Sequence, residues 1–144
     1  MKPILLVVAP YYQDISEMLV SGATSAIYAA DYTAEMVTVP GALEIPAAIS
    51  MAARSNQYAG FVALGCVIRG ETSHYDTVCN ESASGLQQLA VSKHLAIGNG
   101  ILTVETMEQA RVRADVKQGN KGRDAAQAAL RMLELRQLFG LDQS

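Results

Sequence analysis

Short runs of apolar residues alternate along this chain with segments in which apolar residues recur at helical spacing. The first run, residues 4–9, is continuous and rich in branched side chains, as expected for a strand buried on both faces of a sheet. Similar runs predict strands at 35–39, 61–68 and 95–102, the last loosened by Gly98 and Gly100. Helices are predicted over 15–30, 42–54, 72–93, 103–113 and 125–138, with Thr103 as the cap of the fourth.

This alternation predicts an α/β fold with parallel strands joined by right-handed crossovers. We expect a doubly wound four-stranded sheet in the order 2-1-3-4, with helices on both faces. No linker or repeat interrupts the pattern, so residues 1–144 are expected to form a single domain. Ligands of such sheets bind beyond the carboxyl ends of the strands where the order reverses. That rule selects the loops after Ala9, Val39 and Ile68.

Composition narrows the classes of function. Half of the residues are hydrophobic and only 17% are charged, which suits a packed core and excludes disorder as the main state. Eleven basic and 14 acidic residues leave a net charge of −3 without a basic stripe, which argues against nucleic acid as a partner. No apolar run reaches the roughly 18 residues of a membrane span.

Cellular location and metal content are inferred from individual residues. The segment 10–14 follows the first apolar run where a signal peptide would have a small-residue cleavage site, so we expect a cytoplasmic protein. Cys66 and Cys79 form no CxxC pair and suit a reducing compartment. His74 and His94 lack the spacing of metal ligands, so no zinc site is expected.

The loop after the third predicted strand holds the strongest candidate for catalysis. His74 lies in the first turn of the predicted helix, and histidine is the residue type most often used for proton transfer at neutral pH. The backbone N–H groups of that helix start favour a phosphate or another anion. The alternative is a surface histidine at a helix start, and the position at the switch point favours catalysis. His94, at a helix end, is interpreted as structural.

Other candidates each have a plain structural alternative. Glu44 is either a site carboxylate or a side chain that complements a helix dipole. Tyr11 and Tyr12 are either stacking platforms or packing residues. Arg111 and Arg113 form a solvated helix face or supply a phosphate ligand.

Several motifs are missing from the sequence. It contains no P-loop, no GxSxG and no paired acidic residues after the first strand, which argues against a nucleotidase, a hydrolase and a phospho-receiver. The glycines at 98 and 100 lie inside a predicted strand and are no dinucleotide fingerprint. Cys66 has no adjacent base in sequence and is interpreted as a small packing residue.

Five segments in this order and spacing resemble the 6,7-dimethyl-8-ribityllumazine synthase family over almost the whole chain: 39–46, 63–76, 80–81, 99–110 and 119–122. The resemblance implies a three-layer flavodoxin-like sandwich. It also implies condensation of 5-amino-6-(D-ribitylamino)uracil with 3,4-dihydroxy-2-butanone 4-phosphate, giving 6,7-dimethyl-8-ribityllumazine, phosphate and water in the penultimate step of riboflavin biosynthesis. No cofactor and no metal are expected.

The resemblance also implies roles for individual residues. His74 is the expected proton-transfer residue. The residues expected to contact the aminouracil are Tyr11, Ala42, Leu43, Glu44, Cys66, Val67, Ile68 and Asn99. Those expected to hold the butanone phosphate are Glu71, Thr72, Arg113 and Lys121. Asn99 stands where many relatives have Phe, and Pro10 and Tyr12 replace Arg and Asn around the first aromatic residue.

Two of these residues point to an oligomer. Asn99 falls within a predicted strand and Arg113 at a helix end, so neither belongs to the rim that carries Tyr11 and His74. The simplest explanation is that they complete a neighbour's site, and the family implies a homo-pentamer with sites between subunits. A start directly at the first strand favours a free pentamer, whereas the length of 113–122 leaves a 60-subunit shell open.

Three alternatives remain at the level of sequence. A non-catalytic flavin- or lumazine-binding protein would use the same pocket, but it would need neither His74 nor Arg113. The other two are a sugar-phosphate enzyme on the same fold and a structural shell protein.

Overall fold

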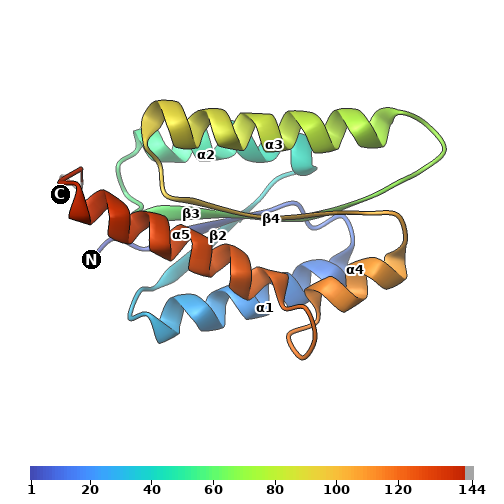
Figure 1. The fold of residues 1–144 in the computed structure, drawn as a ribbon, viewed down its shortest axis with the longest axis horizontal. Helices are drawn as coiled ribbons and strands as arrows, with labels where there is room; N and C mark the ends of the chain where they lie inside the picture. Colours follow the sequence, from blue (N-terminus) through green and yellow to red (C-terminus); the bar gives the residue numbers. More distant parts are fainter. Residues whose placement is uncertain (142–144) are drawn as a thin grey trace.

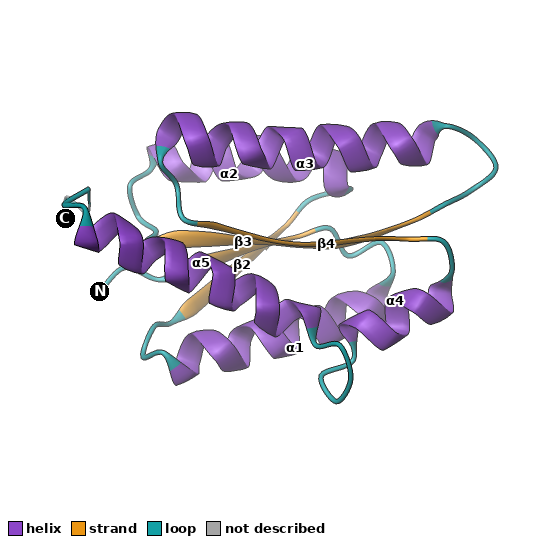
Figure 2. Cartoon of the chain, viewed as in Figure 1, coloured by secondary structure: helices purple, strands orange, loops and turns teal. Residues whose placement is uncertain are grey.

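The computed structural model describes residues 1–141, which form three layers with a parallel sheet between two layers of helices (Figures 1 and 2). The strand order is β2-β1-β3-β4, which confirms the predicted 2-1-3-4 topology. The strands are β1 (Ile4–Val8), β2 (Ala34–Thr38), β3 (Gly60–Ile68) and β4 (Ile97–Val104). One face is covered by α1 (Gln13–Ala29), α4 (Met107–Ala114) and α5 (Lys121–Leu138), and the other by α2 (Ile45–Arg54) and α3 (His74–Lys93).

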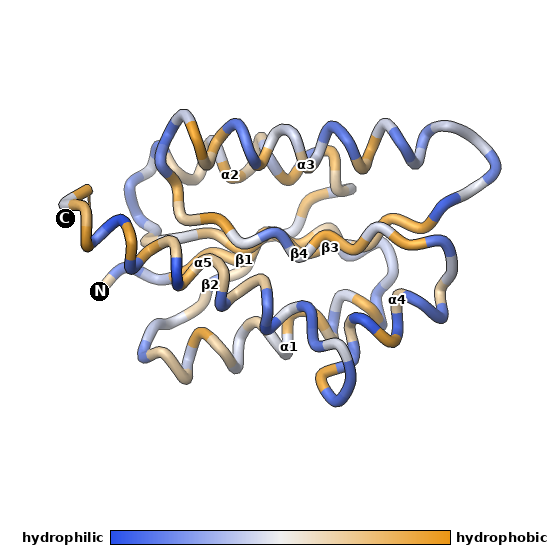
Figure 3. The backbone as a smooth tube through the Cα atoms, in the orientation of Figure 1, coloured by the Kyte–Doolittle hydropathy of each residue, from blue (hydrophilic) through white to orange (hydrophobic). Residues whose placement is uncertain are grey.

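The central strand β1 shows why its sequence is uniformly apolar. Ile4, Leu6 and Val8 pack into the core beneath α1 and α5, whereas Leu5 and Val7 pack into the core beneath α2. No β1 side chain is more than 2% exposed, because helices cover both faces of the sheet. The hydrophobic path of the strands between amphipathic helices is visible in Figure 3.

The predicted starts of α2 and α3 need correction, and α5 begins at Lys121, earlier than the predicted 125. The helix predicted from residue 72 begins at His74, since the Thr72 hydroxyl accepts the His74 N–H at 3.3 Å and holds the preceding residues in a turn. The helix predicted over 42–54 is divided into a 3₁₀ turn, η1 (Ala42–Glu44), followed by α2. Pro46 lies in the first turn of α2, where its missing N–H costs no helical hydrogen bond.

The segment around β4 was predicted least well. The strand runs to Val104, so Thr103 is not a helix cap. Thr106 caps α4 instead, and its hydroxyl accepts the Gln109 N–H at 3.2 Å.

Gly98 and Gly100 do not loosen β4, because each allows close packing. A Cβ at Gly98 would lie 1.8 Å from the Ala125 carbonyl oxygen on α5, and one at Gly100 would lie 2.7 Å from a Leu64 methyl. The missing side chains therefore set how closely α5 approaches the sheet.

His94 ends α3 in the left-handed conformation, with φ 57°, and its carbonyl accepts a hydrogen bond from Arg136 of α5. This placement agrees with the structural interpretation of His94. Within the described residues, every helix is too short or too polar to span a lipid bilayer.

Candidate active site

A cavity of about 470 Å³ opens at the carboxyl ends of β1 and β3, where the strand order reverses. The chain leaves β1 toward one face of the sheet and β3 toward the other, as the switch-point rule requires. Eight residues predicted for the site line it: Tyr11, Ala42, Leu43, Glu44, Cys66, Val67, Ile68 and His74. We call this the switch-point cavity.

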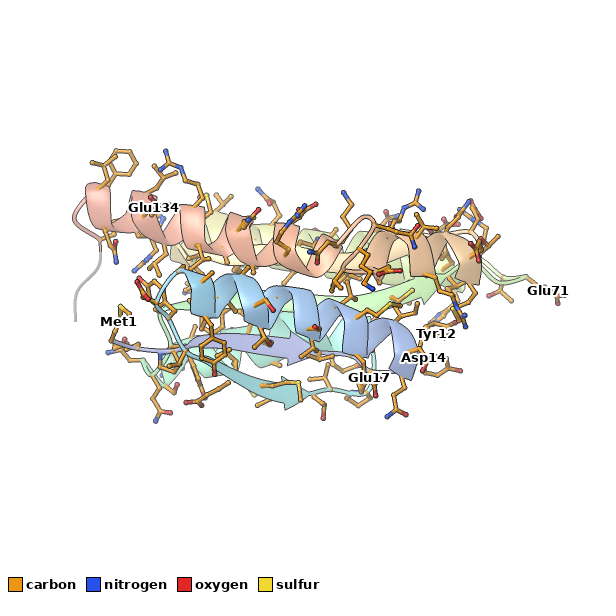
Figure 4. The ribbon with its side chains drawn as sticks, turned by 90° about the horizontal axis from the view of Figure 1, so that it is seen from below. Met1, Tyr12, Asp14, Glu17, Glu71 and Glu134 are labelled. Carbon is orange, nitrogen blue, oxygen red and sulfur yellow. The ribbon has the colours of Figure 1, made fainter. Side chains whose placement is uncertain are left out.

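Two adjacent tyrosines form one wall of the switch-point cavity. Their ring centroids lie 4.9 Å apart in an edge-to-face arrangement. Tyr12 is half-buried at the start of α1, whereas Tyr11 is 77% exposed and leaves a ring face open to a planar ligand. Figure 4 shows Tyr12 at the same end of the molecule as Glu71, opposite Met1 and Glu134.

The polar groups of this cavity come from two different helical turns. Glu44 ends η1 and directly precedes α2, and its side chain makes no capping hydrogen bond. His74 is the first residue of α3 and is exposed. Apolar side chains of Val67, Ile68 and Val78 form the remaining wall, so a carboxylate and an imidazole face a largely apolar space.

Burial raises the pKa of the Cys66 thiol to about 11. The thiol is therefore protonated at neutral pH and is a poor nucleophile. This agrees with its interpretation as a packing residue that also lines the cavity.

We expect Cys66 to react slowly with iodoacetamide at pH 8. A pKa near 11 leaves about 100-fold less thiolate than the ordinary value of 9.0. Measured on a Cys79→Ser variant, the rate should rise about tenfold per pH unit until pH 10. A rate that levels off below pH 9 would contradict the raised pKa.

A second cavity, of about 360 Å³, lies against β4 and the amino-terminal end of α5. It brings together three further predicted residues, Asn99, Arg113 and Lys121. Arg113 Nη1 donates to the Gln109 carbonyl at 3.1 Å, and Lys121 Nζ lies 3.6 Å from Asp124 Oδ2. Two cations and one carboxylate give this β4 cavity a net positive charge, which suits an anion.

Asn99 lies on the edge strand of the sheet, with its side-chain oxygen directed toward Ile101, two residues further along the strand. Its Oδ1 accepts the Ile101 N–H at 2.9 Å, and its amide NH₂ is a hydrogen-bond donor.

Within residues 1–141, no residue lines both the switch-point cavity and the β4 cavity. This matches the expectation that Asn99 and Arg113 lie away from the rim of Tyr11 and His74. Glu71 and Thr72 line neither cavity and lie in the exposed loop before α3. The sequence predicted a helix start at Thr72, and this prediction is wrong, because α3 begins at His74.

Some residues that line the two cavities were not among the site residues predicted from the sequence. Gly41 and Val78 line the switch-point cavity, as does Tyr12, which the sequence offered as a stacking platform but not as an aminouracil contact. Thr103 and Asp124 line the β4 cavity. A cavity of about 530 Å³ between α1 and β2 offers Glu17 as its only titratable side chain among the described residues.

The described residues contain no group of three His, Cys, Asp or Glu side chains that could hold a metal ion.

The fold and these cavities define a flavodoxin-like α/β protein with a cavity at the switch point, where this class of fold binds its ligands. The 6,7-dimethyl-8-ribityllumazine synthase family matches residues 2–137. The chain is 56% identical to 6,7-dimethyl-8-ribityllumazine synthase 1 of Rhizobium meliloti (strain 1021), covering 96% of this chain and 94% of that protein. It is 52% identical to the 6,7-dimethyl-8-ribityllumazine synthase of Sphingopyxis alaskensis, covering 98% and 99%. The chain therefore belongs to the lumazine synthase family, as its motifs indicated.

Proposed function

We propose that this protein condenses 5-amino-6-(D-ribitylamino)uracil with 3,4-dihydroxy-2-butanone 4-phosphate to form 6,7-dimethyl-8-ribityllumazine. It acts as a lumazine synthase in riboflavin biosynthesis, a transferase function supported by the family match and by close relatives of that name. The observation that carries the residue assignments is the switch-point cavity, in which His74 and Glu44 face stacking and apolar side chains.

The aminouracil is assigned to the switch-point cavity. The open face of Tyr11 can stack on the pyrimidine ring, and Val67 and Ile68 cover it with apolar surface. Glu44 can accept hydrogen bonds from the ring N–H or ribityl hydroxyl groups. Fixing the amine against the ketone supplies much of the rate by orientation.

The butanone phosphate is assigned to the junction between two subunits. Arg113 and Lys121 of a neighbouring chain supply the positive charge of its β4 cavity. Glu71 and Thr72, in the exposed loop before α3, remain assigned to this substrate. A homo-pentamer is the proposed assembly, with a 60-subunit shell as the larger alternative.

Proton transfer is assigned to His74. The amine attacks the ketone to form an imine and release water, phosphate leaves, and the second amine closes the ring with loss of water. The imidazole can accept and return protons in these steps because histidine titrates near neutral pH. The two free thiols suit a reducing compartment, and we assign the protein to the cytoplasm.

The proposed reaction is tested by mixing both substrates with the protein and following the fluorescence of the lumazine product. Multiple turnovers that depend on both substrates support it. A protein that binds the product but releases no phosphate from the butanone would instead be a non-catalytic binder, and the proposal would be wrong.

We expect His74→Ala to lower kcat by about tenfold to 100-fold without abolishing turnover, because orientation of the substrates persists. His94→Ala is the matched control, since His94 lies at the far end of α3 and should leave kcat unchanged. A correctly folded His74→Ala protein with no detectable turnover would contradict this ranking.

A further inference from the structure

The turn that carries His74 is exposed and held by local contacts. Residues 71–74 are all exposed, and Ser73, the residue before α3, makes no side-chain capping bond. The His74 N–H donates to the Thr72 hydroxyl at 3.3 Å, within the same turn. An acid–base residue must be held within a fraction of an ångström of its working position. Something beyond the turn must therefore fix it to the sheet.

Arg69 contacts both the end of β4 and the first turn of α3. It follows β3 directly, and its N–H donates to the Val104 carbonyl at the end of β4 at 2.9 Å. Its Nε lies 2.9 Å from Glu105 Oε2, and its Nη2 lies 3.3 Å from Asp76 Oδ1. The guanidinium carbon lies 4.4 Å from the centre of the Tyr75 ring.

The chemistry of these contacts requires an arginine. The planar guanidinium directs separate N–H groups at two carboxylates while its face covers an aromatic ring, which a lysine ammonium cannot do. Partial burial and a hydrogen bond with Cys79 raise the pKa of the Tyr75 hydroxyl, so the ring beneath the guanidinium is neutral at physiological pH. Tyr75 and Asp76 are the two residues that follow His74.

We infer that Arg69 is a positioning residue for His74, fastening the next two residues of α3 to the end of β4. The inference rests on the proposed function, because it assigns Arg69 a role only through the acid–base work of His74. The Arg69 guanidinium is engaged by Asp76, Glu105 and the Tyr75 ring, so it acts on His74 through these contacts.

The kinetic test compares Arg69→Met with Arg69→Lys and with the control Arg131→Met, which removes another exposed arginine–carboxylate pair on α5. Arg69→Met should lower kcat about tenfold and change KM for either substrate less than about threefold. Arg69→Lys should recover part of kcat, and Arg131→Met should match the parent protein. In a His74→Ala background, Arg69→Met should change kcat less than about twofold. A full tenfold loss in that background would overturn the inference.

A second test needs no activity. The chain has two histidines, so protein labelled with ¹³C-histidine gives two imidazole signals, assigned by His74→Ala. Arg69→Met should shift or broaden the His74 signal and leave the His94 signal unchanged. An unchanged His74 signal would overturn the inference even if activity falls. An inactive parent protein with the expected shift would instead refute the proposed function alone.

Folding is checked by the thermal midpoint. Exposed ion pairs contribute little to stability, so Arg69→Met should lower Tm by less than about 5 °C. If the methionine variant does not fold, Arg69→Lys undergoes both tests, and an unperturbed His74 signal with full kcat would overturn the inference.

Discussion

Arg113→Ala should lower kcat/KM for the butanone phosphate by about 10²–10³-fold. Arg113 lines the β4 cavity beside Lys121, and its helix holds the side chain through the Gln109 carbonyl at 3.1 Å. A guanidinium that neutralises a phosphate forms charge-assisted hydrogen bonds, and a loss of about 10²–10³-fold corresponds to about 3–4 kcal/mol. Steady-state kinetics with the butanone phosphate varied at saturating aminouracil measure the effect.

The matched control is Arg111→Ala. Arg111 lies on the same short helix and carries the same charge, but it lines neither cavity. It should retain kcat/KM within about twofold, as expected for a surface charge. Equal losses from the two variants would show that only net charge matters, and the assignment of Arg113 to the phosphate would be wrong.

Sharing of the site between subunits is tested with the same variant. His74→Ala and Arg113→Ala chains, each impaired, should regain activity when mixed under conditions that exchange subunits, because some junctions then combine an intact His74 with an intact Arg113. Subunit exchange is verified by mass on differently tagged chains. Proven exchange without recovery would contradict sites formed between chains.

Gly98→Ala should destabilise the fold by about 3 kcal/mol or more, a large part of the total of about 5–15 kcal/mol for a domain of this size. The added Cβ would lie 1.8 Å from the Ala125 carbonyl oxygen and 2.7 Å from its carbonyl carbon. Both atoms belong to the backbone of α5, so a side-chain rotation cannot relieve the overlap. Urea unfolding followed by circular dichroism measures the loss.

Gly70→Ala is the control for this effect. Nothing lies within 4 Å of a Cβ at Gly70, so its free energy of unfolding should stay within about 0.5 kcal/mol of the parent value. Equal stability of the Gly98 and Gly70 variants would mean that α5 can move away from β4 at little cost.

The sequence predicted the sheet order and the location of the switch-point cavity because both follow from the alternation of buried strands and helices. The ends of helices and strands were predicted less well where a hydrogen bond from a single side chain determines them. The hydroxyl of Thr72 delays α3, and Thr106, two residues after β4 ends, caps α4. The interpretation of Gly98 as a loosening residue was wrong. A glycine is needed there because Ala125 of α5, 27 positions further along the chain, packs against it, and no local pattern reveals that contact.

The candidate site was predicted only in part, because some of its residues are positioned by helix packing. The position of Asn99 within a strand was sufficient to predict that it lies away from Tyr11, and the two residues line different cavities. Asp124 lines the β4 cavity only because of how α5 is placed, and that placement depends on packing over long sequence distances. The contacts of Arg69 with Glu105 join segments that periodicity cannot relate to one another.

The separation of the switch-point cavity from the β4 cavity has an arithmetic consequence for assembly. If each catalytic pocket needs one half from each of two chains, a linear stack of chains always leaves an unmatched half at either end. A closed ring leaves none, and the number of working pockets then equals the number of chains. Ring closure would thus be selected by catalytic yield per molecule synthesised, independently of any gain in stability.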